Sequence, residues 1–210
     1  NNSIVYPERL RRHTAVLVDG VEDVWYEYVP ASYDGTKPVP LVLSMHGGLM
    51  TGWGQAVYTS WTLVADREGL IVLFPDANKR RFWLVEYDKV NHSQATKPNP
   101  EGVYLNPPPD NPDDNHDMNC MLALIEHAKT RYNIDAGRVF MQGMSMGNMM
   151  TSQFARYHGQ ALAGQAGSAG PTALPLLFDE QDQIINRGGP LAVWQSRMEL
   201  DKVPTTHFAG

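Results

Sequence analysis

The stretch VFMQGMSMGNMM lies at Val139–Met150. A short apolar run leads into Gly143–Gly147, and residues typical of helices follow. The pattern Gly-x-Ser-x-Gly thus lies between a predicted strand and a predicted helix, where a serine sits on a tight, strained turn with its hydroxyl exposed. The two glycines are expected because side chains there would collide with the neighbouring strand and helix. We therefore predict that Ser145 is a nucleophile and that the Met146 N–H faces an oxyanion.

Buried strands and amphipathic helices alternate through the rest of the chain. Strands are predicted at 13–19, 24–29, 41–45, 70–74, 139–141, 162–169 and 191–195. Helices are predicted at 55–68, where Gly69 ends the helix, at 117–132, where Asp117 is the N-cap, and from 146 to about 157. Short apolar runs alternating with helices are typical of a mostly parallel sheet with helices on both faces. We expect a single α/β domain over residues 1–210.

A second glycine pair follows the predicted strand at 41–45. His46, Gly47 and Gly48 continue directly from that strand. Glycines just past a buried strand let backbone N–H groups approach a ligand closely, which suits the second half of an oxyanion hole. Gly48 is therefore the predicted partner of Met146, and His46 is expected to support this loop.

Composition excludes several classes of protein. The chain has 42% hydrophobic and 19% charged residues and a net charge of -6. No basic cluster is long enough to indicate nucleic-acid binding. No apolar run approaches the roughly 20 residues of a membrane span. We expect neither a nucleic-acid nor a membrane partner, and the single cysteine, Cys120, excludes a disulfide within the chain.

Three stretches together resemble a known enzyme family. They are PVPLVLSMHGG at 38–48, TLVADREGLIVLFPD at 62–76 and RYNIDAGRVFMQGMSMGNMM at 131–150. In this order they are similar to the α/β-hydrolase esterases that include polyhydroxybutyrate depolymerases, feruloyl esterases and acetylxylan esterases. The resemblance implies a serine hydrolase of carboxylic esters that needs no metal or organic cofactor. It also implies a secreted or extracellular location, since the family is often exported, although a cytoplasmic location stays open.

Nucleophilic catalysis by serine needs a base and an acid that orients it, in the chain order Ser, Asp or Glu, His. The resemblance assigns the acid to Asp201, just after the last predicted strand, with Glu199 as the competing choice. Only His207 lies beyond Asp201, whereas the family's histidine follows one more strand. We therefore expect a C-terminally incomplete chain, without its final strand and histidine loop, whose catalytic histidine lies beyond Gly210.

An alternative triad uses His207 as the base with Asp179 or Asp182 as the acid. His116 with Asp113, Asp114 and Asp117 is a candidate metal site, because these residue types bind metal ions. Acidic loops are more often simply solvated, so no metal is expected.

Aromatic residues supply the candidate substrate contacts. Trp53 and Tyr58 follow the predicted oxyanion loop, and Trp83 lies in the irregular segment 77–115. Long irregular segments of this kind often carry function, so part of the substrate-facing surface is expected there.

The predicted function is that of a serine carboxylesterase acting through an acyl-enzyme on Ser145. Feruloyl or acetyl esters of plant polysaccharide and hydroxyalkanoate polyesters are the leading substrates. Two alternatives stay open: a peptidase of the same fold, and a non-catalytic binding module whose triad has decayed.

Overall fold

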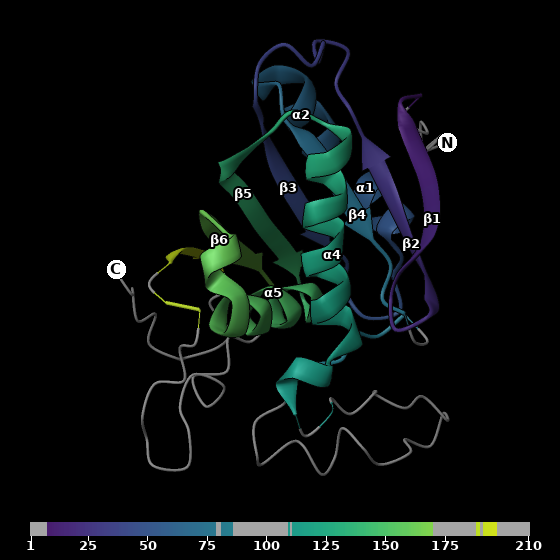
Figure 1. The fold of residues 1–210 in the computed structure, drawn as a ribbon, viewed down its shortest axis with the longest axis vertical. Coiled ribbons are helices and arrows are strands. Elements are labelled where there is room, and N and C mark those ends of the chain that lie inside the picture. Colours follow the sequence, from purple (N-terminus) through teal and green to yellow (C-terminus); the bar gives the residue numbers. More distant parts are fainter. Residues whose placement is uncertain are drawn as a thin grey trace.

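A computed structural model of the chain describes residues 8–78, 81–85, 109, 111–169, 188–189 and 191–196. Within these ranges seven strands form one sheet in the order β1-β2-β4-β3-β5-β6-β7 (Figure 1). The strands are β1 Leu10–Val18, β2 Val21–Tyr28, β3 Val39–Met45, β4 Ile71–Pro75, β5 Ile134–Met144, β6 Gly164–Ser168 and β7 Ala192–Ser196. β2 runs antiparallel to both β1 and β4, and every later pair is parallel. The sheet is mostly parallel, as predicted.

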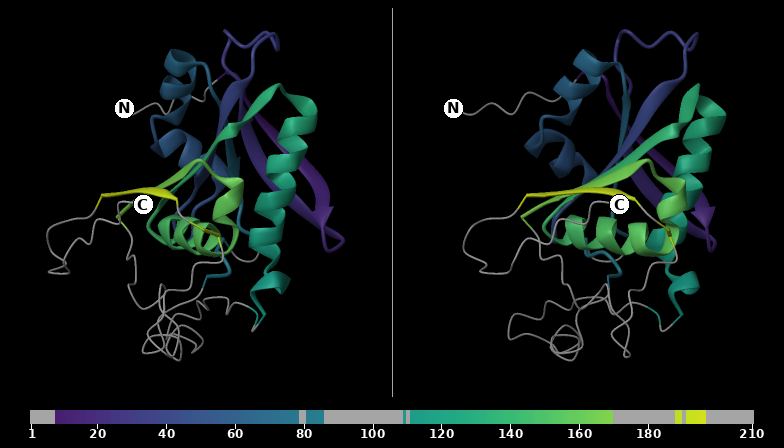
Figure 2. Two further views of the ribbon diagram at one scale, coloured as in Figure 1. Left: turned by 60° about the vertical axis from the view of Figure 1, so that its left-hand side comes forward. Right: turned by 90° about the vertical axis from the view of Figure 1, so that its left-hand side faces the viewer.

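Helices cover both faces of the sheet (Figure 2). They are α1 Gly52–Tyr58, α2 Trp61–Glu68, α4 His116–Arg131 and α5 Met146–His158, with short 3₁₀ helices η1 Pro112–Asp114 and η2 Gly159–Ala161. α1 and α2 lie on one face, and α4 and α5 lie on the other. Among the described helices, none is both long and apolar enough to cross a membrane.

Side chains that alternate along the central strands form a core on each face. In β3, Leu41, Leu43 and Met45 pack into the cluster beneath α4 and α5, whereas Val42 packs into the cluster beneath α1 and α2. Met150 of α5 is fully buried in the first cluster. Fully burying one such side chain contributes roughly 1.5–3 kcal/mol. Both clusters depend on the same central strands, so the layers on the two faces stabilise one another.

One predicted helix is two helices in the structure. The expected helix at 55–68 is interrupted between α1 and α2, where Thr59 is extended, with φ -101° and ψ 163°. The Thr59 N–H and Oγ1 both donate to the Gln55 carbonyl, at 3.0 and 2.8 Å, and so end α1. Periodicity alone did not reveal this break, because threonine also occurs inside helices, where its hydroxyl can donate to a carbonyl one turn earlier. Gly69 ends α2 in the left-handed region at φ 68°, as predicted.

The N-cap of α4 is Asn115, not the predicted Asp117. The Asn115 side chain accepts a hydrogen bond from the Met118 N–H at 3.1 Å. Asp117 lies inside the first turn and is 2% exposed. Asparagine and aspartate both cap helices well, so their spacing in the sequence did not separate them.

Gly52, the first residue of α1, marks a close contact between that helix and β4. A β-carbon added to Gly52 would lie 2.0 Å from the Phe74 carbonyl oxygen. The Gly52 N–H also donates to the Asp76 carboxylate beyond the end of β4. By contrast, a β-carbon added to Gly54, two residues later, would lie 3.5 Å from its nearest neighbour, Thr51 Oγ1.

We expect Gly52→Ala to destabilise the protein by about 2–3 kcal/mol, because backbone must shift to admit the methyl group. The matched control Gly54→Ala should change stability by no more than about 1 kcal/mol, with helix propensity favouring alanine. Denaturant midpoints of the two variants measure the difference. Equal midpoints would show that α1 is not fixed by its contact with β4.

Candidate active site

Ser145 occupies the turn between β5 and α5 in a strained backbone conformation. Its φ is 54° and its ψ is -117°, a combination that residues other than glycine rarely adopt. Such conformations cost about 1–3 kcal/mol and cluster at active sites. The Ser145 side chain is exposed and makes no capping hydrogen bond to α5, so it does not serve as an ordinary helix cap. Its backbone N–H donates to the Ser168 carbonyl at 2.9 Å, which ties the turn to the end of β6.

The glycines on either side of Ser145 are required by close backbone contacts. A β-carbon on Gly143 would lie 2.0 Å from the Gly147 carbonyl oxygen. One on Gly147 would lie 2.2 Å from the Met45 carbonyl oxygen, at the end of β3. The start of α5 therefore packs directly onto β5 and β3, which is the reason the sequence pattern needs both glycines.

The loop after β3 lies beside Ser145. Met45 pairs with Gly143 in the parallel register of β3 and β5, so the residues after Met45 emerge next to the serine turn. A β-carbon on Gly47 would lie 3.5 Å from Ser145 Cβ, and one on Gly48 would lie 3.6 Å from Met146 Sδ. The structure thus brings together Ser145 and both residues predicted to form the oxyanion hole.

Backbone N–H groups of α5 and of the loop after β3 lie near Ser145. Met146 and Gly147 are the first two residues of α5, where N–H groups have no partner within the helix and carry the positive end of its dipole. In the facing loop, the Met50 N–H donates to the Gly47 carbonyl at 3.2 Å, and the Leu49 N–H donates to the Arg81 carbonyl at 3.0 Å. These two bonds hold the turn that contains Gly48.

His46 is fixed inside the protein and supports this loop. Its Nε2 accepts the Ala77 N–H at 3.0 Å, so in the neutral ring Nδ1 carries the proton and donates to the Gly47 carbonyl at 2.7 Å. Burial lowers the pKa of His46 from 6.5 to about 4, with a smaller contribution from the Arg81 charge. His46 is therefore neutral near pH 7, with both ring nitrogens bonded to backbone.

Trp83 also supports the loop, which corrects its prediction as a substrate contact. The residue is fully buried, its indole N–H donates to the His46 carbonyl at 2.8 Å, and its ring lies 4.6 Å from the His46 ring. No face of the indole is exposed for a substrate. Tyr58, by contrast, is 72% exposed at the end of α1, and Trp53 is half-buried. Their contact with substrate stays a prediction.

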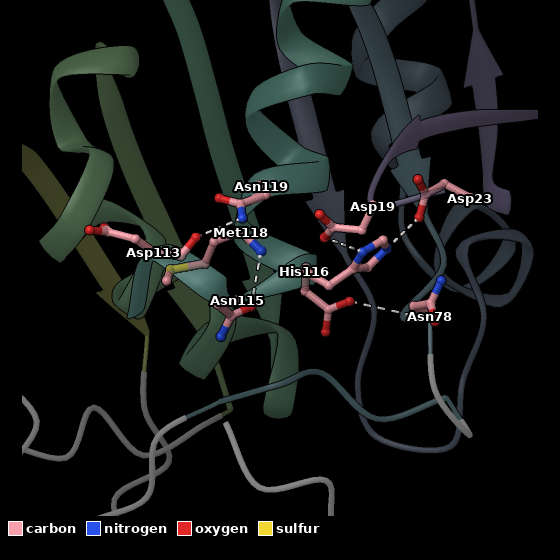
Figure 3. A network of polar contacts seen from close by, with 9 residues as sticks. Asp19, Asp23, Asn78, Asp113, Asn115, His116, Met118 and Asn119 are labelled. Atoms are coloured by element: carbon pink, nitrogen blue, oxygen red, sulfur yellow. Dashed lines mark hydrogen bonds and ion pairs between the residues drawn. The ribbon is translucent and has the colours of Figure 1, made fainter. Parts of the chain in front are cut away.

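The candidate metal site around His116 does not form among the described residues. His116 pairs with Asp23 of β2 at 2.8 Å and with Asp19 of the β1–β2 turn at 3.1 Å, rather than with Asp113 or Asp114 (Figure 3). Burial on its own would lower the pKa of His116, but the hydrogen bonds to the two carboxylates outweigh it and raise the pKa. Across the described ranges, no group of three or more His, Cys, Asp or Glu side chains is placed to hold a metal ion.

The predicted acid and base lie outside the described residues. These are Asp201 with its competitor Glu199, His207, and the alternative acids Asp179 and Asp182. Within the described residues, no hydrogen bond joins Ser145 Oγ to a histidine. The described part of the site therefore comprises the candidate nucleophile and oxyanion donors.

The chain is similar to esterases in sequence and in structure, although no family model matches it. A bifunctional acetylxylan esterase/xylanase of Neocallimastix patriciarum is 29% identical over 141 residues, covering 66% of this chain and 16% of that protein. Feruloyl esterase B of Neurospora crassa is 26% identical over 148 residues, covering 69% of this chain and 43% of that protein. The structure of an acetyl xylan esterase from Aspergillus awamori aligns with a TM-score of 0.57 and 20% identity, covering 83% of this chain and 56% of that one.

These similarities confirm the α/β-hydrolase fold and the resemblance to acetylxylan and feruloyl esterases. The chain spans less than half the length of either sequence relative.

The buried, neutral His46 predicts a dependence of stability on pH. Because its pKa of about 4 in the folded protein lies below the ordinary 6.5, the unfolded chain binds more protons between these values. The contribution of His46 is thus complete above pH 6.5 and is lost as the pH falls toward 4. Linkage puts the loss between pH 7 and pH 5 at about 2 kcal/mol.

We expect His46→Gln to destabilise the protein at pH 7, with a gap to wild type that narrows by about 2 kcal/mol at pH 5. Denaturant titrations of both proteins at the two pH values measure this gap. A gap independent of pH would contradict a neutral, desolvated imidazole.

Proposed function

We propose that the protein is a serine carboxylesterase with Ser145 as its nucleophile. The observation that carries the proposal is the strained, exposed Ser145 beside two backbone segments whose N–H groups suit an oxyanion. A serine that only capped a helix would need neither the strain nor the flanking glycine contacts. The relatives named as acetylxylan and feruloyl esterases support the same reaction class.

In the proposed reaction, Ser145 Oγ attacks the ester carbonyl while a histidine takes its proton. The N–H groups of Met146 and Gly48 hold the oxyanion, and one such donor contributes roughly 3–4 kcal/mol in comparable sites. The histidine then protonates the leaving alcohol, and water releases the acid from the acyl-enzyme. Neither a metal nor an organic cofactor takes part.

Asp201 is the proposed acid that orients the histidine. The base is either a histidine that the gene product carries beyond Gly210 or His207 itself, which would pair with Asp179 or Asp182. The experiment below separates these two cases.

The proposed substrates are acetyl or feruloyl esters of plant polysaccharide, and the similarity to an acetylxylan esterase and a feruloyl esterase favours them over hydroxyalkanoate polyesters. Tyr58 and Trp53 are the proposed aromatic contacts, since rings of this kind stack on phenolic or sugar groups. A polymeric substrate of this kind would be met outside the cell, so we also propose that the protein is secreted.

We expect a fluorophosphonate probe to add one phosphonyl group to Ser145 in the full-length gene product, since the probe needs an activated serine and an oxyanion hole. Intact mass and peptide mapping measure the label. Ser145→Ala should abolish labelling, whereas Ser60→Ala, at an exposed serine without a capping hydrogen bond, should not change it.

Labelling of the full-length product but not of the 210-residue chain would place the base beyond Gly210. Equal labelling rates would place the base within the 210-residue chain and make His207 the first residue to test. If neither protein is labelled, the esterase proposal fails and the binding-module alternative takes its place.

A further inference from the structure

Residues 81–84 form a strut behind the loop that carries Gly48. The Arg81 carbonyl accepts the Leu49 N–H at 3.0 Å, and the Trp83 indole donates to the His46 carbonyl at 2.8 Å. Between them, Phe82 Cε1 would lie only 3.1 Å from a β-carbon on Gly48. Three consecutive residues of the strut thus contact three residues of the loop, so a shift of the strut moves the Gly48 N–H.

Three side chains bond the backbone of Leu84, at the C-terminal end of the strut. The Leu84 N–H donates to Asp117 Oδ2 at 2.7 Å. The Leu84 carbonyl accepts from Asn115 Nδ2 at 2.8 Å and from Gln153 Nε2 at 2.9 Å. Asp117 and Asn115 lie at the start of α4, and Gln153 lies on α5, the helix that follows Ser145. The backbone polar groups of Leu84 are therefore bonded from two helices.

These three side chains are unusual because they are polar and almost fully buried. Asn115 is 1% exposed, and Asp117 and Gln153 are each 2% exposed. Burial raises the pKa of Asp117 to about 6, while the hydrogen bonds from the backbone N–H groups of Leu84 and Asn78 oppose this rise. The Asn78 bond is long, at 3.5 Å (Figure 3). His116 and Asp23 are the other charges that act on this carboxyl. Apolar side chains here would leave the Leu84 N–H and carbonyl without these partners, and buried polar groups stabilise a fold only when every partner is in place.

We propose that Asp117, Asn115 and Gln153 are positioning residues for the oxyanion hole. They fix the backbone of Leu84, and through the strut they set the position of the Gly48 N–H relative to Ser145. Because Gln153 belongs to α5, the backbone of Leu84 connects the helix that follows Ser145 to the loop that carries Gly48. This inference rests on the proposed esterase function. The mechanical link from Leu84 through the strut to the Gly48 loop does not depend on that function.

The position of an oxyanion donor affects the transition state more than the bound substrate. A misplaced Gly48 N–H should therefore lower kcat and leave KM nearly unchanged. A displacement near 1 Å can cost about 100-fold in rate. A residue that only stabilised the fold would lower the amount of active protein and would leave kcat per folded molecule unaltered.

The test compares Asp117→Ala with Asp117→Asn in the intact protein, using a chromogenic acetate ester. We expect Asp117→Ala to lower kcat about 10- to 100-fold, with KM within about threefold of wild type. Asp117→Asn keeps an oxygen for the Leu84 N–H, and it loses the long contact to Asn78 and the carboxylate charge near His116 and Asp23. Because the bond to Leu84 remains, its kcat should stay within about threefold. Asp114→Ala, at an exposed carboxylate next to the same helix, is the control for lost charge.

A second variant guards against misfolding of Asp117→Ala. Asn115→Ser keeps a side-chain cap for α4 but removes the donor to the Leu84 carbonyl. It should fold and should lower kcat several-fold. The proposal is overturned if both Asp117→Ala and Asn115→Ser keep wild-type kcat, or if Asp117→Asn is as impaired as Asp117→Ala.

Hydrogen exchange tests the mechanical link without activity. Amides in 46–50 and 81–84 should exchange faster in Asp117→Ala than in wild type or Asp114→Ala, while amides of β3 and β5 keep their rates. Uniform acceleration along the chain would reduce Asp117 to a residue that only stabilises the fold. If the wild-type protein hydrolyses no ester, the esterase proposal fails, but the exchange result still decides whether the strut positions the loop.

Discussion

The close approach of α5 to the ends of β3 and β5 is the constraint on which the rest of the structure depends. At Gly147 the backbone of the helix contacts the Met45 carbonyl, and a β-carbon there would lie only 2.2 Å from that oxygen. Because α5 packs so closely, the backbone must reverse direction within one residue between β5 and α5. That residue is Ser145, at φ 54°. The strain at the serine thus follows from packing. The same contact holds the loop after β3 next to the serine, so one packing constraint places both the candidate nucleophile and the candidate oxyanion donors.

A buried polar network on the opposite face of the sheet keeps β3 and β5 in this register. Gln142 Oε1 accepts from Ser44 Oγ and from the Trp61 indole, each at 2.9 Å. Gln55 of α1 donates to Ser44 Oγ at 3.0 Å. A slip of one residue in either strand would turn its polar side chain, Ser44 or Gln142, into the apolar cluster beneath α4 and α5, where that side chain would lose these partners. The network therefore favours the single register that brings Met45 beside Gly143.

Parts of the fold and of the serine turn were predictable from the sequence where a single physical cause explains the residue type at a position. Gly143 and Gly147 were predicted from steric need, and the apolar run at 41–45 indicated a strand buried on both faces. Prediction from the sequence failed where polar residues act over long distances. Nothing local in the sequence indicates that Asp117 and Gln153 meet at Leu84, because this contact joins segments 33 and 69 residues apart. Trp83 was misjudged for the same reason, since its partner, the His46 carbonyl, is 37 residues away.

Strain and buried polar groups both cost folding free energy, and here they lie within one site. The backbone at Ser145 costs about 1–3 kcal/mol. The side chains that bond the backbone of Leu84 include the carboxyl of Asp117, whose pKa is raised by burial. Net stabilities of domains are only about 5–15 kcal/mol, so such costs are a sizeable fraction of the whole. A protein that used this surface only for binding would gain stability by relaxing the serine turn. Under the proposed function, the combination of strain, close glycine contacts and a braced loop at 46–50 would serve a transition state that needs all three.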